Sequence, residues 1–223
     1  MKLTFLIFSV LLLFVEQAQA QTYVPRNGDL LFQDMDCGPL CDAIEKVTDG
    51  VGGLDFSHMG LVYVTENNAA FVIEAISGSV QMTPLEQFVH RSRDANGNPK
   101  VVVAHLPDSL VDVSHQAVRI ARAQLGVPYD NAFLPNNGKW YCSELIADAF
   151  NKAAGYTLFA DAPMTFKDPE TGSFFPAWVE YYRELETRIP EGRPGCNPGG
   201  MSRAPFLEIE LPYSDFGGAY APR

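Results

Sequence analysis

Cys142 is the residue of this sequence best placed to act as a nucleophile. Cysteine catalysis needs a thiolate, a base that takes the thiol proton, and a third polar group that orients the base. Cys142 begins a segment of helical periodicity, residues 142–154. Free N–H groups and the dipole at a helix N-terminus stabilise a thiolate and can hold the oxyanion of an acyl-transfer intermediate. The alternative is a buried structural cysteine.

Glu74 interrupts an apolar row and therefore needs a partner. Along residues 70–76 the side chains alternate between two faces, and Glu74 shares its face with apolar neighbours. An unpaired carboxylate there would cost free energy. His58 begins the preceding strand pattern, residues 58–64, and is the partner that we expect. The alternative is that Glu74 reaches solvent at a sheet edge.

The register of this hairpin decides whether the imidazole meets the carboxylate. A three-residue loop over residues 65–67 pairs Val64 with Asn68, and the same ladder sets His58 directly opposite Glu74. A slip of two residues keeps both side chains on one face but loosens the contact, whereas a slip of one residue separates them.

Strand and helix patterns alternate along the chain and predict an α+β fold, with a small antiparallel sheet or partial barrel packed against helices. Strand patterns cover residues 28–32, 58–64, 70–76, 100–106 and 206–211. Helix patterns cover residues 37–47, 114–125, 142–154 and 174–185, and another helix starts at Thr83 as N-cap with Pro84 in its first turn. The segment after Gly155 is rich in Pro, Gly and aromatic residues. It forms either one wall of a pocket or, as we expect, a wrap that closes the fold.

Residues 1–20 have the pattern of a secretory signal peptide. A lysine at position 2, an apolar run over residues 3–15 and a small-residue ending at Ala20 predict cleavage after Ala20. The apolar run is shorter than the about 20 residues that span a bilayer. We therefore expect a single domain over residues 21–223, secreted or periplasmic and without a transmembrane segment after cleavage. An uncleaved anchor or a buried N-terminal helix is the alternative.

The composition of the chain argues against some classes of binding partner. The formal net charge of −11 argues against nucleic acid and against binding to anionic lipid. No Gly-x-Ser-x-Gly elbow, phosphate-binding Gly loop or His-Glu-x-x-His pair occurs, so we expect no metal and no cofactor. Of the four cysteines, Cys37 and Cys41 are separated by three residues, which suits either a local disulfide or two free thiols.

Five motifs, in this order, resemble one known family. They read GDLLF at residues 28–32, FSHMGL at 56–61, VIEA at 72–75, GVPYD at 126–130 and YCSELI at 141–146. Their order is similar to that of the YiiX/YebB-like branch of the NlpC-type cell-wall peptidase superfamily. The resemblance covers roughly residues 27–154 and implies a circularly permuted papain-like fold, in which the His strand precedes the Cys helix.

The resemblance also implies roles and a function. Cys142 matches the nucleophile, His58 the base and Glu74 the orienting residue, while Tyr129 and Ser57 fall in the substrate-binding wall. The expected activity is that of a cysteine peptidase or amidase, which cleaves an amide through an acyl-enzyme on Cys142. Cell-wall-type peptides are the first substrate class implied. N-acyl amides or lipids, processed by an acyl hydrolase or acyltransferase, are the alternative, and so is a non-catalytic binding module on the same scaffold.

Overall fold

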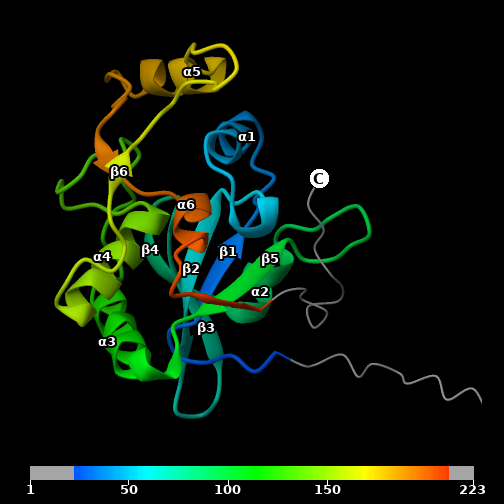
Figure 1. The fold of residues 1–223 in the computed structure, drawn as a ribbon, viewed down its shortest axis with the longest axis vertical. Helices are drawn as coiled ribbons and strands as arrows, with labels where there is room; N and C mark the ends of the chain where they lie inside the picture. Colours follow the sequence, from blue (N-terminus) through cyan, green and yellow to red (C-terminus); the bar gives the residue numbers. More distant parts are fainter. Residues whose placement is uncertain (1–22, 211–223) are drawn as a thin grey trace, which may run out of the picture.

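The computed structural model describes residues 23–210, whose largest element is an antiparallel sheet of six strands (Figure 1). The strand order is β4-β3-β2-β1-β5-β8. The strands are β1 (Leu30–Gln33), β2 (His58–Val64), β3 (Ala70–Ile76), β4 (Ser79–Pro84), β5 (Val101–His105) and β8 (Glu208–Glu210). The expected signal peptide, residues 1–20, lies outside the described residues.

Helices cover both faces of this sheet, which confirms the α+β class. They are α1 (Pro39–Lys46), α2 (Leu85–His90), α3 (Val111–Arg122), α4 (Cys142–Ala154), α5 (Pro176–Glu184) and α6 (Pro198–Ser202). Short 3-10 turns span Val51–Gly53 and Asp108–Leu110, and a small ribbon joins β6 (Ala162–Pro163) to β7 (Pro194–Gly195). Helices α3 and α4 pack on each other, α4 lies on β2 and β3, and α2 contacts β3 and β4.

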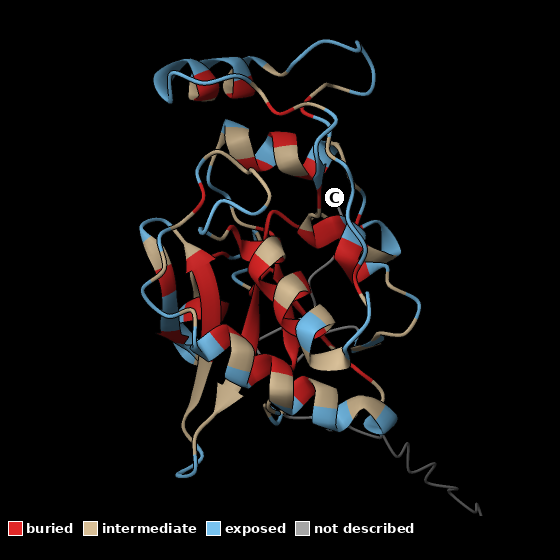
Figure 2. Ribbon diagram, turned by 90° about the vertical axis from the view of Figure 1, so that its left-hand side faces the viewer, coloured by how far each residue is buried: buried red, intermediate tan, exposed pale blue. Residues whose placement is uncertain are grey.

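Strand alternation builds the two apolar layers. In β1, Leu30 and Phe32 join the larger core beneath α3 and α4, whereas Leu31 joins a smaller core that includes Phe88 of α2. Buried residues accordingly fill the sheet and the inner sides of the helices, as Figure 2 shows. Every strand that carries a candidate site residue is therefore held by packing on both faces.

The hairpin between β2 and β3 has a register two residues away from the expected one. Val64 pairs with Ala70 rather than with Asn68, because the loop contains five residues and not three. Thr65 closes the loop against Ala69 through backbone and side-chain hydrogen bonds of 2.9 and 3.0 Å. Asn68, not Asn67, takes the left-handed conformation, with φ 61°. His58 and Glu74 keep a common face but are not directly opposite each other.

Thr83 does not cap a helix. It pairs with Val72 in β4, a strand that the sequence pattern did not indicate, and α2 begins only at Leu85. No side chain caps that helix. The hydroxyl of Thr83 instead points to Glu74, as described below.

The chain after α4 runs to α5, at the top of the view in Figure 1, and returns through α6, which contacts α4 and β1. The aromatic core of this segment contains Phe166, Trp178 and Tyr182 and packs against α1. β8 then returns to the main sheet and pairs with β5. No helix among the described residues is long and apolar enough to cross a membrane.

Candidate active site

Helix α4 carries Cys142 on its first turn. Tyr141 precedes it in an extended conformation, with φ −96° and ψ 168°, and no side chain caps the helix. The N–H groups of the first turn are therefore available to an anion. Gly155 ends the helix in the left-handed conformation with φ 75°. Cys142 is 7 % exposed and faces a cavity, so the helix presents a shielded thiol to a bound molecule.

His58 and Glu74 are in direct contact despite their offset. His58 Nε2 lies 2.6 Å from Glu74 Oε2. The paired residues end at Leu61 and Ile73, and continuing that register by one residue places Gly60 opposite Glu74. His58 is then a diagonal neighbour of Glu74, which is still within reach of a long side chain. A Cβ at Gly60 would lie 2.3 Å from Val72 Cγ1, so this face tolerates no side chain between His58 and Val62.

Glu74 has two further partners that the sequence did not indicate. Thr83 Oγ1 donates to Glu74 Oε1 at 2.5 Å, and Arg91 Nη2 donates to the same oxygen at 2.6 Å. Burial alone would raise the pKa of Glu74, but the hydrogen bonds and charges of His58 and Arg91 outweigh it and lower the pKa to about 2. A buried carboxylate in an apolar row needs several partners. In the sequence, this requirement is the signal that a cation, here Arg91, lies beside Glu74.

Cys142 lies near enough to His58 to raise the pKa of its imidazole. Because Nε2 is engaged by Glu74, Nδ1 is the ring nitrogen available to the thiol. Burial alone would lower the pKa of His58, but the nearby Cys142 and Glu74 raise it to about 9. The structure therefore brings Cys142, His58 and Glu74 together, and the raised pKa of His58 favours the charged imidazole at neutral pH.

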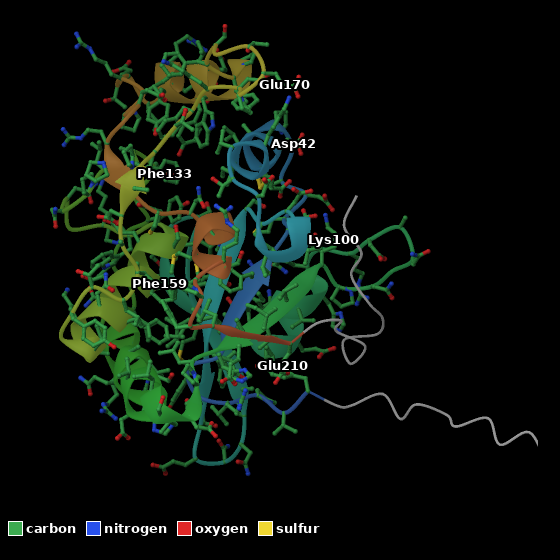
Figure 3. All side chains as sticks on the ribbon, in the orientation of Figure 1. Asp42, Lys100, Phe133, Phe159, Glu170 and Glu210 are labelled. Atoms are coloured by element: carbon green, nitrogen blue, oxygen red, sulfur yellow. A yellow bond between two sulfur atoms is a disulfide. The ribbon has the colours of Figure 1, made fainter. Side chains whose placement is uncertain are left out.

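A cavity of about 590 Å³ opens beside Cys142. Its walls come from the end of α1, the residues before and at the start of α4, the loop after α4, Trp178 of α5 and the segment 195–206. The segment after Gly155 thus forms a pocket wall, and the expectation of a mere wrap is wrong. Phe133 and Phe159, both labelled in Figure 3, line this cavity. In that view Phe133 lies toward α5 and Phe159 toward α3.

Two side chains next to Cys142 hold the wall of the cavity to the helix. Ser143 Oγ donates to the carbonyl oxygen of Cys196 at 3.0 Å, and the Cys196 N–H donates to the Tyr141 hydroxyl at 3.2 Å. At the other end of α4, Asn151 Oδ1 accepts from the N–H groups of Leu158 and Phe159. One helix therefore positions both the thiol and the cavity wall.

Tyr129 and Ser57, the two residues expected in the substrate wall, both line the cavity. Burial and the neighbouring Cys142 raise the pKa of Tyr129 well above its usual value, so its phenol stays neutral. Ser57 Oγ accepts from the Met35 N–H at 2.9 Å and donates to the Met35 carbonyl at 3.3 Å. These bonds fix the strand start before His58.

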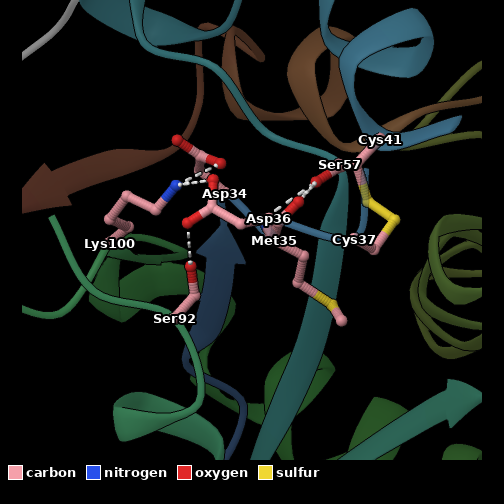
Figure 4. The surroundings of a disulfide bond; sticks show 8 residues. All are labelled: Asp34, Met35, Asp36, Cys37, Cys41, Ser57, Ser92 and Lys100. Carbon is pink, nitrogen blue, oxygen red and sulfur yellow. Dashed lines mark hydrogen bonds and ion pairs between the residues drawn. A yellow bond between two sulfur atoms is a disulfide. The ribbon is translucent and has the colours of Figure 1, made fainter. Parts of the chain in front are cut away.

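A partly buried ionic network supports the chain on the other side of Ser57 (Figure 4). Lys100 Nζ lies 2.8 Å from Asp34 and 2.6 Å from Asp36. Burial and Asp34 raise the pKa of Glu45, which contacts Ser57, to about 8. Next to this network a disulfide joins Cys37 to Cys41 at the start of α1, with a Cα–Cα distance of 5.4 Å. The sequence left either a local disulfide or two free thiols open for this pair, and the structure has the disulfide.

The remaining cysteine, Cys196, is free and lines the cavity with Cys142. Burial raises the pKa of its thiol to about 12. A thiol with such a pKa remains protonated, and a protonated thiol is a weak nucleophile. Of the two free cysteines that line the cavity, Cys196 is therefore poorly suited to act as a nucleophile.

A helix-borne cysteine beside a strand-borne histidine and carboxylate, with the histidine strand earlier in the chain, defines a permuted papain-like arrangement. The chain belongs to the family described as "Permuted papain-like amidase enzyme, YaeF/YiiX, C92 family", whose pattern it matches over residues 24–209. This family membership confirms the resemblance seen in the sequence motifs.

Two relatives illustrate the match. The chain is 31% identical over 156 residues to the uncharacterized protein YiiX of Escherichia coli K12. The aligned residues make up 70% of each protein. It is also similar in structure to yiiX from Escherichia coli O157:H7, with a TM-score of 0.67, 25% identity and coverage of 85% of this chain and 98% of that one.

That solved structure is described as a metalloprotein. In this chain, no group of three or more His, Cys, Asp or Glu side chains within residues 23–210 is arranged to hold a metal ion. His58 Nε2 is already bonded to Glu74. The described residues therefore do not fit a metal site.

Proposed function

We propose that this chain is a cysteine amidase that cleaves an amide bond through an acyl-enzyme on Cys142, with His58 as base and Glu74 as the orienting group. The supporting observation is that Cys142 raises the pKa of His58 from close by and that His58 in turn contacts Glu74, where Nε2 and Oε2 are 2.6 Å apart. Family membership supports the same class of chemistry.

In the first half of the reaction, the sulfur of Cys142 attacks the carbonyl carbon of the amide. A C–S bond forms while the carbonyl oxygen takes negative charge, which the free N–H groups of the first turn of α4 stabilise. The C–N bond then breaks, and the leaving amine takes a proton from the His58 imidazolium. Glu74 keeps the imidazole ring oriented and stabilises its positive charge.

In the second half, water replaces the amine. His58, now neutral, accepts a proton from water as its oxygen attacks the thioester carbon. The C–S bond breaks, the carboxylic acid leaves, and the sulfur and imidazole return to their starting state. Cys142, His58 and the attacking water complete the proton balance.

Labelling with iodoacetamide at neutral pH tests the activated thiol. We expect selective reaction at Cys142, with Cys196 reacting far more slowly because burial raises the pKa of its thiol to about 12. Mass spectrometry of digested protein locates the label. Equal, slow labelling of both cysteines would contradict the proposal and favour the non-catalytic binding module.

The substrate class implied by the family resemblance is a small peptide, first of all a cell-wall-type peptide, and the second class is an N-acyl amide. The apolar walls of the cavity favour the second class. Incubation of the enzyme with both classes, followed by mass spectrometry of the products, separates them.

We further propose that the protein is exported after cleavage behind Ala20. The Cys37–Cys41 disulfide supports this proposal, since disulfides form and persist in oxidising compartments. The expected result is that secreted or periplasmic protein begins at Gln21, as determined by mass spectrometry of the intact chain. Exported protein that still carries residues 1–20 would contradict it.

A further inference from the structure

The two oxygens of the Glu74 carboxylate have different partners. Oε2 lies 2.6 Å from Nε2 of His58. Oε1 accepts hydrogen bonds from Thr83 Oγ1 at 2.5 Å and from Arg91 Nη2 at 2.6 Å. A carboxylate that is held through one oxygen does not rotate freely, so its other oxygen stays directed at the imidazole.

Helix α2 determines where the guanidinium of Arg91 lies. Arg91 follows the last residue of α2, and its Cζ lies 4.6 Å from the centroid of the Phe88 ring. Phe88 is fully buried, and its ring centroid lies 5.8 Å from that of His58. Gln33 Nε2 donates to the Phe88 carbonyl oxygen at 2.8 Å, which ties α2 to β1. The same helix therefore brings a cation to the carboxylate and packs a ring against the imidazole.

Two cationic groups share this one carboxylate. Glu74 is fully buried, and the side chain of Arg91 is 19 % exposed. Within the described residues, the titratable groups that face the His58–Glu74 pair from the neighbouring elements are Cys142 of α4 and Arg91 after α2, while Thr83 of β4 is a neutral donor. Buried charges are weakly screened, and a nearby positive charge disfavours a second one. Arg91 therefore opposes the positive charge of the imidazolium.

This opposition matters for the proton that His58 must give away. Although burial alone would lower the pKa of His58, Cys142 and Glu74 raise it to about 9. A general acid works best when its pKa lies near the operating pH. A carboxylate that faced His58 alone would hold the imidazole proton still more tightly and slow its transfer to the leaving amine.

We propose that Arg91 is a positioning residue of the active site, which directs Oε2 of Glu74 at His58 and limits how strongly Glu74 holds the imidazole proton. This inference rests on the proposed function and adds the group that regulates its acid and base. Glu74 and Arg91 act on His58 with opposite signs, because the first favours the imidazolium and the second disfavours it.

Nuclear magnetic resonance of protein with isotope-labelled histidine follows the protonation of His58 directly and without substrate, and His58→Ala assigns its signal. In Arg91→Met we expect the protonation midpoint of His58 to rise by about one pH unit, because a cation is lost from a weakly screened site. Arg91→Gln keeps an N–H donor but no charge and should give the same rise should Arg91→Met not fold. Arg91→Lys keeps the charge over Phe88 and should restore the wild-type midpoint.

Two further variants separate charge from structure. Arg93→Met is the matched control, since Arg93 is exposed, bonds to the Gly97 carbonyl oxygen at 2.6 Å, and its loss changes the net charge by the same amount. Its midpoint should equal that of wild type. Thr83→Val removes a neutral donor from Glu74 and should shift the midpoint by less than half as much as Arg91→Met. An unchanged or lowered midpoint in Arg91→Met, or an equal shift in Arg93→Met or Thr83→Val, would overturn the inference.

Iodoacetamide labelling distinguishes this failure from a failure of the proposed function. If Cys142 is labelled selectively and the midpoint of His58 does not respond to Arg91→Met, the inference about Arg91 alone is wrong. If Cys142 is labelled no faster than Cys196, the proposed function is wrong, whatever the titration of His58 shows.

Discussion

The part of the molecule that holds Cys142, His58 and Glu74 and the part that surrounds the cavity are built from different interactions. The first is ordered by strand ladders, one helix N-terminus and a carboxylate with three partners. The second has little regular structure, and aromatic rings hold it, with centroid distances of 5.7 Å for Phe133–Trp178 and 5.1 Å for Phe166–Trp178. Directional bonds set the geometry of the reaction, whereas packing sets the shape of the cavity. Selectivity can therefore change while the reactive geometry is kept.

Removing the thiol should give the largest effect in the hydrogen-bonded part. Cys142→Ala is expected to lower kcat/KM at least about a thousandfold, because loss of a nucleophile costs orders of magnitude. The fold should persist, since alanine at a helix start changes little packing. Circular dichroism and activity on one amide substrate measure both. Cys196→Ala, which removes the free thiol without a base, should cost less than about tenfold. If the activity of Cys142→Ala stays within tenfold of wild type, Cys142 is not the nucleophile.

Neutralising the third group should have the next largest effect. Glu74→Gln keeps the shape and an acceptor oxygen but removes the charge that faces His58 and Arg91. We expect kcat/KM to fall about a hundredfold, less than for Cys142→Ala or His58→Ala, because Glu74 orients the base without taking part in bond making. A folded Glu74→Gln enzyme with wild-type kinetics would show that another residue orients His58.

The same ion pair predicts a pH dependence of activity. The pKa of His58 is raised to about 9, so the imidazolium is lost as pH rises through 9, and kcat/KM should fall about tenfold per pH unit beyond it. In Glu74→Gln this fall should begin at lower pH, because one of the bonds that raises the pKa of His58 is gone. An unchanged pH profile in that variant would separate Glu74 from the protonation of His58.

The stability of the folded protein should depend on pH through the same two groups, His58 and Glu74. The folded pKa of His58 lies above its usual 6.5, so its contribution is complete below pH 6.5 and is lost as pH rises through about 9. The folded pKa of Glu74 lies below its usual 4.5, so its contribution is present above pH 4.5 and is lost as pH falls towards about 2. The pair therefore stabilises most between pH 4.5 and 6.5. Urea unfolding of wild type and Glu74→Gln, measured below, within and above this pH range, should show the largest difference in the free energy of unfolding within it.

Trp178→Ala tests the aromatic part and should leave the chemistry nearly intact. Trp178 is 3 % exposed and packs against Phe133 and Phe166, so its loss should destabilise the fold by about 3 kcal/mol. KM should rise about threefold to tenfold while kcat changes less, since the wall moves and the reactive groups do not. A fall in kcat as large as that of Glu74→Gln would show that the two parts are not separable.

The disulfide should have the smallest effect on activity. Cys37 and Cys41 lie at the start of α1, while the cavity is lined by residues at the end of that helix. Replacing both with alanine should change kcat/KM less than about threefold and destabilise the fold by at most about 2 kcal/mol, because the bridge closes a short loop. A folded but inactive double variant would assign the pair a part in the chemistry.

The same division explains what the sequence could predict. Residues 58–64, 70–76 and 142–154 form elements with those bounds, because alternation, helical spacing and a terminal glycine are local signals. The hairpin register was wrong by two residues, since loop length depends on the hydrogen bonds that Thr65 makes within the folded loop. Tyr129 and Ser57 line the cavity as expected, but the segment after Gly155 was expected to be a wrap and not a wall. Its contacts, such as Phe133 with Trp178, join residues far apart in the chain and leave no periodic pattern.

The order of elements along the chain has a consequence for how the protein matures. During synthesis the base is made first, in β2, the nucleophile follows in α4, and the last cavity residues come at 195–206. Contacts between such distant segments form only after the later one has left the ribosome. A nascent chain that ends after α4 has Cys142 and His58 but no closed cavity. Under the proposed function, the complete cavity and hence selective turnover arise only once almost the whole described chain has been made.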